Sequence, residues 1–248
     1  MGPGGRVCPK VVQMSTAGSQ SPPNSTGGTV AVCDLVLPCR DEGPALRALL
    51  PKVPAAFAVV VVDNGSRDDT AAIARDLGAT VVSESVPGYG SAVHTGLLAA
   101  THDYVAFMDG DGSFDPDELL PMLAEVRAGT ADLAVGRRRP VSRRVWPWHA
   151  RAGNALIVAW LRRRIHMDAH DIAPMRLCGR QALLDLGVED RRFGYPVELL
   201  QKATNAGWRF SERDVTYHPR AEGTRSKVSG SVKGTFRTAR DFWKVLHR

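Results

Sequence analysis

The chain has few cysteines and no long apolar run, and each shortage excludes a class of protein. Its 248 residues include four cysteines, no two of which form a C-x-x-C pair, so neither a zinc site nor a disulfide framework is expected. A reducing cytoplasm fits that cysteine usage. The longest apolar candidate, Ala152 to Leu161, stops at Arg162-Arg163-Arg164 and is far shorter than the ~20 residues of a transmembrane helix. No membrane span is expected.

Residues 1–28 have no hydrophobic periodicity. They are rich in Gly, Pro, Ser and Thr and lack the basic-then-apolar order of a secretory signal, so we expect a disordered leader. Residues 29–248 are expected to form one domain, because a chain of this length buries a sizeable core without staples. The content of 44% hydrophobic and 23% charged residues is that of an ordinary soluble globular protein.

Charge divides the chain into two halves. Residues 1–136 hold 8 basic and 16 acidic residues, a net charge of −8, whereas residues 137–248 hold 24 and 10, a net charge of +14. An acidic half beside a basic half suits a site with a divalent metal on one side and phosphate groups on the other. Basic surface alone also suits nucleic acid or anionic lipid.

Strand-like and helix-like segments alternate between Thr29 and Gly136. Strands are predicted at 29–37, 57–62, 80–83 and 104–108, and helices at 44–52, 68–77, 90–100 and 116–127. This order predicts an α/β fold, in which helices cover both faces of a mostly parallel sheet. Beyond Gly136 the rhythm breaks, and we expect helices at 149–164, 179–186, 196–206 and 235–246, a strand at 208–217 and a basic loop at 223–233.

Two carboxylates follow one predicted strand directly. Asp109-Gly110-Asp111 comes after the apolar run Tyr104 to Met108, and sheets of this kind bind ligands at the carboxyl ends of their strands. Two acids one residue apart repel each other and gain from a divalent cation; Mg²⁺ or Mn²⁺ bound in this way keeps waters and bridges to substrate phosphates. The alternative is a polar turn, which Asp111-Gly112 satisfies by itself.

Two further strand ends carry polar residues. Asp63-Asn64-Gly65 follows a buried strand, and its carboxylate and amide are suited to hydrogen bonding with a nucleobase or ribose. The alternative is an Asn-Gly turn that leads into a capped helix. The segment Pro38-Cys39-Arg40-Asp41-Glu42 ends the first strand with a charged turn. Three polar strand ends in one crevice predict a ligand site.

These three strand ends, together with the glycine-containing segment Gly88-Tyr89-Gly90-Ser91-Ala92 and Gly96, resemble the nucleotide-sugar half of the family-2 glycosyltransferases with a GT-A fold. They are residues 37–42, 62–70, 88–96 and 108–111. The stretch from Arg220 to Lys227 resembles a loop of the dolichyl-phosphate mannose or glucose synthases. The family implies a Rossmann-like domain in which residues 29–136 bind the nucleotide sugar and residues 137–248 bind the acceptor, with a basic C-terminal extension.

The resemblance implies roles for individual residues. On the nucleotide side it implies contacts from Pro38, Arg40, Glu42, Asp63, Asn64, Gly65, Gly88 and Tyr89. Around the metal and the diphosphate it implies Asp109, Gly110 and Asp111, with Arg220, Ser226 and Lys227 in a loop that closes over the diphosphate and the acceptor. Near the acceptor phosphate it implies Arg138, and Arg151 with Asn154.

Three departures from the family pattern fall on the nucleotide side. Arg40-Asp41 stands where the family often has an aromatic residue and Asn, Asp63-Asn64 replaces Asp-Asp, and Tyr89 replaces the lysine of Gly-Lys-Gly. The base therefore stays open among uridine, guanosine and thymidine. The third metal ligand also stays open, because Ser113 stands where a longer side chain would coordinate better.

The family implies direct displacement with inversion at the anomeric carbon. A metal held by Asp111, with Arg220 and Lys227 opposite, would stabilise the departing diphosphate. A phosphate acceptor is already ionised near neutral pH and needs no base, whereas a hydroxyl acceptor needs one. Asp171 and Glu198 are the candidates for that base; the alternatives are a helix cap for Asp171 and a solvated helix face for Glu198.

The segment between residues 143 and 164 contains both tryptophans and arginines. Trp146, Trp148 and Trp160 beside arginines suit a surface that rests on anionic lipid headgroups. The alternative is that the indoles pack inward while the arginines face water.

We therefore expect a metal-dependent, inverting glycosyltransferase that uses a GDP-, UDP- or dTDP-sugar and a polyprenyl phosphate, located in the cytoplasm or peripherally at the inner face of the membrane. The main alternative keeps the donor chemistry but uses a soluble acceptor: a phosphorylated metabolite, a natural product or a cell-wall precursor. A nucleic-acid-binding module is the remote alternative. It lacks aromatic platforms and leaves the acidic strand ends unexplained, so no nucleic-acid partner is expected.

Overall fold

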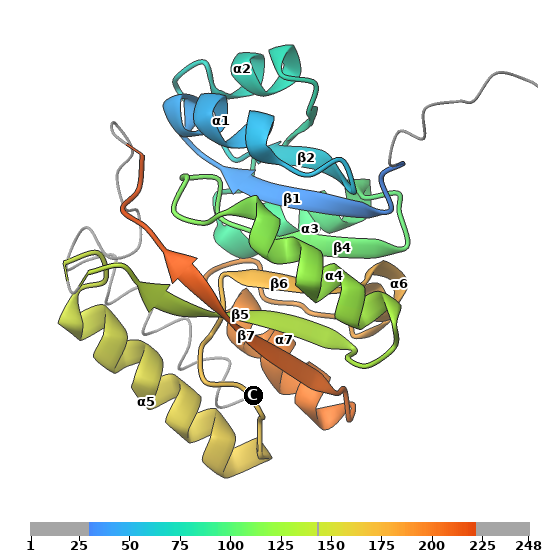
Figure 1. The fold of residues 1–248 in the computed structure, drawn as a ribbon, viewed down its shortest axis with the longest axis vertical. Helices are drawn as coiled ribbons and strands as arrows, with labels where there is room; N and C mark the ends of the chain where they lie inside the picture. Colours follow the sequence, from blue (N-terminus) through green and yellow to red (C-terminus); the bar gives the residue numbers. More distant parts are fainter. Residues whose placement is uncertain (1–29, 143, 222–248) are drawn as a thin grey trace, which may run out of the picture.

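One seven-stranded sheet runs through residues 30–142 and 144–221, the residues described by this computed structural model (Figure 1). Its strand order is β3-β2-β1-β4-β6-β5-β7. The strands are β1 (Cys33–Cys39), β2 (Phe57–Asp63), β3 (Thr80–Ser83), β4 (Tyr104–Phe107), β5 (Leu133–Pro140), β6 (Met175–Gly179) and β7 (Phe210–Tyr217). Strand β6 is antiparallel to its neighbours β4 and β5, and the other pairs are parallel. The predicted α/β class with a mostly parallel sheet is confirmed.

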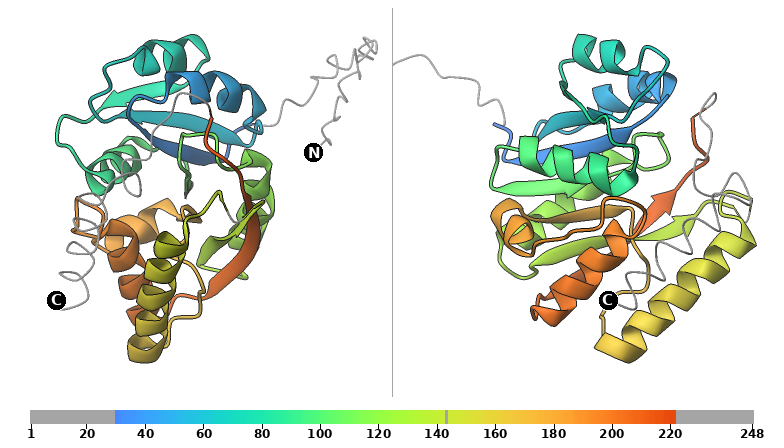
Figure 2. Two further views of the ribbon diagram at one scale, coloured as in Figure 1. Left: turned by 90° about the vertical axis from the view of Figure 1, so that its left-hand side faces the viewer. Right: turned by 180° about the vertical axis from the view of Figure 1, so that it is seen from behind.

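Helices cover both faces of this sheet, and each face has its own apolar core (Figures 1 and 2). One face carries α1 (Gly43–Leu49), α2 (Thr70–Asp76) and α4 (Leu119–Arg127), with the short 3-10 turns η1 (Leu50–Lys52) and η2 (Pro116–Glu118). The other face carries α3 (Tyr89–Ala99), α5 (Trp148–Ile165), α6 (Arg180–Asp185) and α7 (Tyr195–Asn205). Because both faces are covered, β2 is a continuous apolar run from Phe57 to Val62.

Helix α3 lies unusually close to the centre of the sheet. A Cβ atom at Gly96 would come within 2.3 Å of Val36 Cγ1 and 2.9 Å of Val62 Cγ2, so only glycine permits this approach. The close packing fixes the helix axis over β1 and β2. Its first residue, Tyr89, is thereby held near the carboxyl ends of these strands.

The structure differs from the sequence-based prediction in three strands. Strands β5 and β6 were not predicted, because β5 ends in the charged run Arg137 to Arg139 and β6 carries Arg176 within an apolar stretch. Strand β1 continues past Pro38 to Cys39 instead of ending there. Strand β4 pairs only with Cys33 to Val36, so the missing N–H of Pro38 breaks no hydrogen bond on that side.

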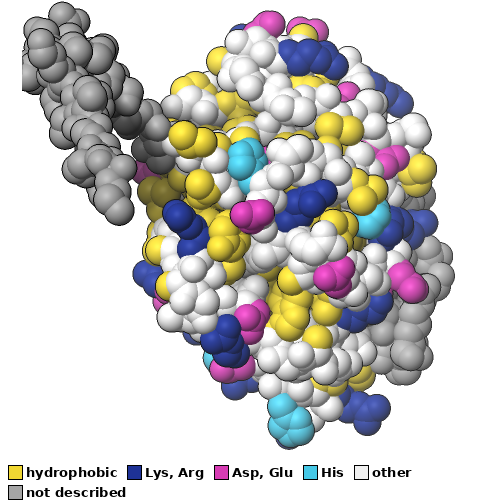
Figure 3. Space-filling model, turned by 90° about the vertical axis from the view of Figure 1, so that its right-hand side faces the viewer, with side chains coloured by type: hydrophobic (Ala, Val, Ile, Leu, Met, Phe, Trp, Pro, Cys, Tyr) yellow, Lys and Arg dark blue, Asp and Glu magenta, His cyan; other side chains and the backbone are white. Residues whose placement is uncertain are grey.

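The carboxyl ends of the parallel strands point to the left in Figure 1. The opposite face of the molecule, seen in Figure 3, shows acidic, basic and apolar side chains interspersed. The expected leader at 1–28, the loop at 223–233 and the helix at 235–246 lie outside the described residues.

Candidate active site

The loop after β4 presents two carboxylates beneath a strap from the end of β7. Asp111 is 3% exposed, and its Oδ1 accepts hydrogen bonds from the backbone N (3.0 Å) and the Oγ (2.5 Å) of Ser113. Arg220 Nε lies 3.0 Å from Asp111 Oδ2. The N–H of Ala221 donates to the Asp111 carbonyl at 3.0 Å, and that of His218 to the Ser113 carbonyl at 2.9 Å. The strap, residues 218–221, therefore lies directly against this loop.

Asp109 is held in an environment that disfavours its charge. Burial, followed by the neighbouring Asp111 carboxylate, raises its pKa from 3.8 to about 6, although Arg220, Arg176 and Arg138 oppose the shift. A buried and a half-buried carboxylate in one loop form a site that a cation stabilises. Within the described residues, no group of three or more His, Cys, Asp or Glu side chains is arranged so that it could hold a metal ion. Two carboxylates nevertheless fit Mg²⁺ or Mn²⁺, since such ions complete their shell with water and substrate phosphate.

The turns after β1 and β2 are joined to each other by hydrogen bonds. The N–H of Asp41 donates to Ser66 Oγ at 3.0 Å, and that of Glu42 to Thr70 Oγ1 at 2.9 Å. Asp63 Oδ1 accepts from the Ser66 N–H at 3.0 Å. Pro38 is half-buried and Arg40 is exposed beside these turns. The turns that we predict to bind the nucleotide are thus linked to each other by hydrogen bonds within the protein.

Asn64 is committed to the loop that leads into α3. Its Nδ2 donates to the carbonyls of Glu84 (2.9 Å) and Val86 (2.8 Å), and its Oδ1 accepts from the Gly88 N–H at 2.9 Å. Both amide hydrogens are therefore used within the protein, which differs from the nucleobase contact expected from the sequence. The side chain positions Gly88 and Tyr89, while Gly65, with φ of +78°, makes the turn.

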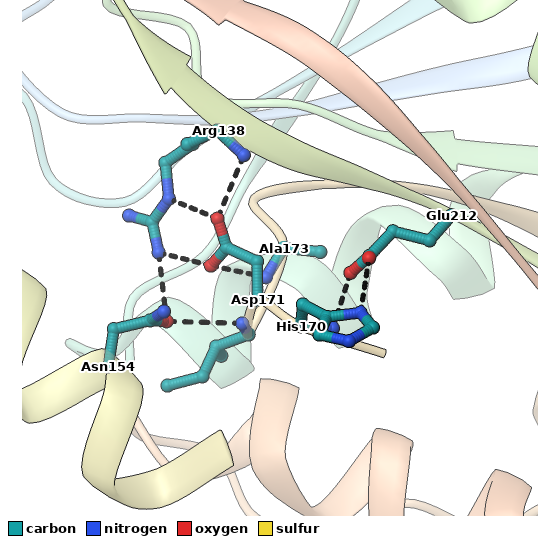
Figure 4. A network of polar contacts seen from close by, with 7 residues as sticks. Arg138, Asn154, His170, Asp171, Ala173 and Glu212 are labelled. Atoms are coloured by element: carbon teal, nitrogen blue, oxygen red, sulfur yellow. Dashed lines mark hydrogen bonds and ion pairs between the residues drawn. The ribbon is translucent and has the colours of Figure 1, made fainter. Parts of the chain in front are cut away.

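Arg138 and Asn154, both half-buried, form one polar network with buried Asp171 (Figure 4). Arg138 donates from its backbone N and its Nε to Asp171 Oδ2, both at 2.9 Å, and from Nη2 to Asp171 Oδ1 at 2.5 Å and Asn154 Oδ1 at 3.1 Å. Its guanidinium also lies 4.0 Å from the ring centre of Trp146. Asp171 is in the loop before β6, so it is not the helix cap weighed above. Arg151 lies exposed on α5.

Glu198 is buried on α7, in contrast to the solvated helix face weighed above. It is 7% exposed and accepts from the N–H groups of Glu189 (3.0 Å) and Asp190 (2.6 Å). Burial works to raise its pKa, but these two hydrogen bonds and Lys202 outweigh it and lower the pKa. The carboxylate therefore fastens the loop before α7.

Sequence reasoning missed Arg176, whose charge acts on Asp109. It is 1% exposed, and its Nη2 donates to the Tyr89 hydroxyl at 2.5 Å. The signal available in the sequence was a single arginine inside the apolar stretch Met175 to Cys178. Ser226 and Lys227, also predicted for the site, lie outside the described residues.

Helix α5 exposes apolar side chains along part of its length. Trp148 is 79% and Leu156 is 72% exposed, whereas Val158 and Leu161 are buried. Trp146 and Trp160 are half-buried, so the tryptophans of this region divide between the two alternatives. No helix among the described residues is both long and apolar enough to cross a bilayer.

Comparison with known proteins gives one consistent family. The family model described as glycosyl transferase family 2 matches residues 34–184. An uncharacterized glycosyltransferase of Mycobacterium tuberculosis is 54% identical over 86% of this chain and 96% of its own length. The polyprenol monophosphomannose synthase of Mycolicibacterium smegmatis is 33% identical over 70% of this chain and 71% of its own length.

A solved structure supports the fold. Glucosyl-3-phosphoglycerate synthase of Mycobacterium tuberculosis, crystallised with Mn²⁺, UDP and glucosyl-3-phosphoglycerate, superposes with a TM-score of 0.61 at 21% identity. The match covers 87% of this chain and 78% of that one. The α/β sheet described above is thus a GT-A fold, and the chain is a glycosyltransferase that belongs to glycosyl transferase family 2.

Proposed function

We propose that this protein transfers a sugar from a nucleoside diphosphate sugar to a phosphate-bearing acceptor, with inversion at the anomeric carbon and with Mg²⁺ or Mn²⁺. The observation that carries the proposal is the Asp109–Asp111 pair at the end of β4, covered by Arg220 at 3.0 Å from Asp111. Mn²⁺ and UDP in the crystals of the structural neighbour support the same donor chemistry.

In this proposal Asp109 and Asp111 hold the metal, which would offset the negative charge of the departing diphosphate. Arg220 binds the diphosphate from the strap, and Lys227 is proposed to act with it. A cation next to the position where charge develops lowers the barrier most. Pro38, Arg40, Glu42 and Asp63 remain our proposed residues for the nucleoside, at the joined turns after β1 and β2.

A phosphate acceptor is favoured because neither candidate base is available. Both oxygens of Asp171 are bonded to Arg138, and those of Glu198 to two backbone N–H groups. A hydroxyl acceptor needs a base to take its proton, whereas an ionised phosphate does not. We propose that Arg138 of β5 orients that phosphate, and that Arg151 and Asn154 of α5 contribute to the same acceptor site.

Two sources supply such a phosphate. A soluble phosphorylated acceptor is supported by the phosphoglycerate product bound in the structural neighbour. A polyprenyl phosphate is supported by the name of the Mycolicibacterium relative and by the exposed Trp148 and Leu156 of α5, which suit contact with a lipid surface. The polyprenyl acceptor expected from the sequence is thereby widened to phosphate-bearing acceptors.

The donor is tested by thermal denaturation with UDP-, GDP- and dTDP-sugars, each with Mn²⁺ and with a chelator. A nucleotide sugar that binds the native protein raises the melting temperature, and we expect this only with metal. Asp111→Ala should remove the response while the protein stays folded. Arg220→Gln should weaken nucleoside diphosphate binding more than nucleoside binding; equal losses would show that Arg220 does not touch phosphate.

The acceptor is tested with a radiolabelled donor, offering 3-phosphoglycerate in one arm and a polyprenyl phosphate in vesicles in the other. Label that moves into butanol identifies a lipid acceptor, and label in a new water-soluble product identifies a soluble one. Transfer to water alone, with no preference for either phosphate, would contradict the proposal. Trp148→Ser with Leu156→Ser should reduce sedimentation with phosphatidylglycerol vesicles if the lipid arm is active, and leave soluble transfer unchanged.

A further inference from the structure

Arg176 is a buried cation, and the register of β6 places it next to β4, the strand before the loop that carries Asp109 and Asp111. It pairs with Phe107 on β4 and with Val135 on β5. Paired residues of an antiparallel ladder point to the same face, and residues two apart on a strand do so as well. Arg176 therefore points to the α3 and α7 face of the sheet, and its charge acts on Asp109 in the loop that follows Phe107.

No carboxylate pairs with this guanidinium among the described residues. Arg176 is 1% exposed, and its Nη2 donates to the Tyr89 hydroxyl at 2.5 Å. Its Nε and Nη1 have no hydrogen-bond partner in the described part of the chain. A buried charge is costly unless it is paired, so the position of Arg176 calls for a reason beyond packing.

The contact with Tyr89 determines the direction of the tyrosine hydroxyl. A guanidinium can only donate hydrogen bonds, so the Tyr89 oxygen must accept this one. The single hydroxyl hydrogen of Tyr89 then points elsewhere, and it is not donated to any of the described residues. A phenol that accepts from a cation is also a stronger donor, because hydrogen bonds in a chain polarise one another.

Two backbone N–H groups at the start of α3 are already used within the protein. The N–H groups of Gly90 and Ser91 donate to the carbonyls of Arg192 (3.0 Å) and Arg191 (2.8 Å). A Cβ atom at Gly90 would lie 2.6 Å from the Asp190 carbonyl oxygen, so this contact is tight. The first turn of α3 is thus packed against the segment before α7, and the hydroxyl of half-buried Tyr89 remains as a donor at its start.

The strap and the tyrosine lie on different faces of the sheet. The strap lines a cavity of about 250 Å³ with Ala45 and Ala48 of α1, together with Gly112, whereas Tyr89 and Arg176 belong to the face of α3 and α7. A diphosphate held between the aspartates and Arg220 leaves the α3 side for the sugar.

We propose that Tyr89, held by Arg176, donates its hydroxyl hydrogen to an oxygen of the transferred sugar, so that this pair determines donor-sugar affinity. Tyr89 is the binding residue, and Arg176 is a positioning residue that acts through it. The inference rests on the proposed function, because it requires a nucleoside diphosphate sugar as donor.

Tyr89→Phe is the decisive variant, since it removes the hydroxyl and keeps the ring. With Mn²⁺ present, we expect the Kd and KM of the active nucleotide sugar, UDP-glucose or GDP-mannose, to rise about tenfold, which corresponds to the loss of one hydrogen bond. The Kd of UDP or GDP and the kcat should stay within about twofold. Tyr195→Phe is the matched control, because it removes another tyrosine hydroxyl, which is buried on the same side of the sheet and has no hydrogen-bond partner among the described residues; it should change neither constant.

Arg176→Lys and Arg176→Met test the positioning residue. Lysine keeps the cation, so we expect it to retain more of the affinity for the nucleotide sugar than methionine does. Equal losses of nucleotide-sugar and diphosphate binding in Tyr89→Phe would overturn the proposal, as would no loss of either. If the unaltered protein binds none of the nucleotide sugars, the proposed function fails. If the unaltered protein binds one of them and Tyr89→Phe binds it equally well, only the role of Tyr89 fails.

Discussion

Replacing Asp109 by asparagine is expected to stabilise the ligand-free protein while it removes the response to metal. The wild-type carboxylate is charged at neutral pH in surroundings that raise its pKa from 3.8 to about 6. No hydrogen bond to its side chain exists among the described residues, so asparagine loses no partner there. The same substitution removes one of the two proposed metal ligands.

The sign and size of the stability change follow from the raised pKa of Asp109. Because the folded-state pKa is raised, the protonated form stabilises the fold below about pH 4, and that stabilisation is lost as the pH rises to about 6 and above. A shift of about two units corresponds to ~3 kcal/mol at ~1.4 kcal/mol per unit. Asp109 is partly exposed, so solvent screening reduces this to about 1 to 2 kcal/mol. For a protein of this length that is a rise of roughly 2 to 8 °C in melting temperature.

Differential scanning fluorimetry at several pH values, in the presence of a chelator, measures this effect. The advantage of Asp109→Asn should be absent at the acid end and grow to its full size above about pH 6. With Mn²⁺ and UDP or GDP added, the wild type should gain stability and the variant should not. Asp111→Asn is the contrast, since it breaks the contact to Arg220 and should lower the melting temperature. An Asp109→Asn protein that is less stable at neutral pH, or whose advantage does not change with pH, would refute the reasoning.

The remaining predictions concern packing and the polar network. Asp171→Ala should lower the free energy of unfolding in urea by about 3 to 5 kcal/mol, because it leaves the Arg138 guanidinium without its carboxylate. The double variant Arg138→Met with Asp171→Leu should recover part of that loss. Additive losses of the two substitutions would contradict the pairing. Gly96→Ala should cost about 1 to 3 kcal/mol because its Cβ meets Val36 at 2.3 Å. Gly153→Ala is its control, as nothing lies within 4 Å of a Cβ there, and it should be neutral or slightly stabilising; equal effects at the two glycines would show that α3 has room to move.

The sequence by itself determined the class of fold and the location of the proposed metal site. Local periodicity was enough to find β1 to β4 and the helices between them, because covered parallel strands are continuous apolar runs. The turn residues at Asp63 and Asp109 mark where those strands end. Parallel strands have their carboxyl ends at the same end of the sheet, so the sequence placed both residues there.

Only the tertiary structure decided how the polar side chains are used. Asn64 donates across the turn to Glu84 and Val86, Asp171 pairs with Arg138, and Glu198 fastens a loop instead of facing water. The local sequence suggested a base contact, a helix cap and a solvated face for the same three residues. A side chain of this kind has several local uses of similar free energy, and the partner brought in from a distant segment selects one.

Arg176 shows the same limit for a charge. An arginine in an apolar stretch gives no period by which a strand is recognised, so β6 was missed along with it. Its contact to Tyr89 exists only because the antiparallel register of β6 brings it to the face covered by α3. Strand register and helix packing are long-range properties, and they are set by the whole core and not by the residues next to Arg176.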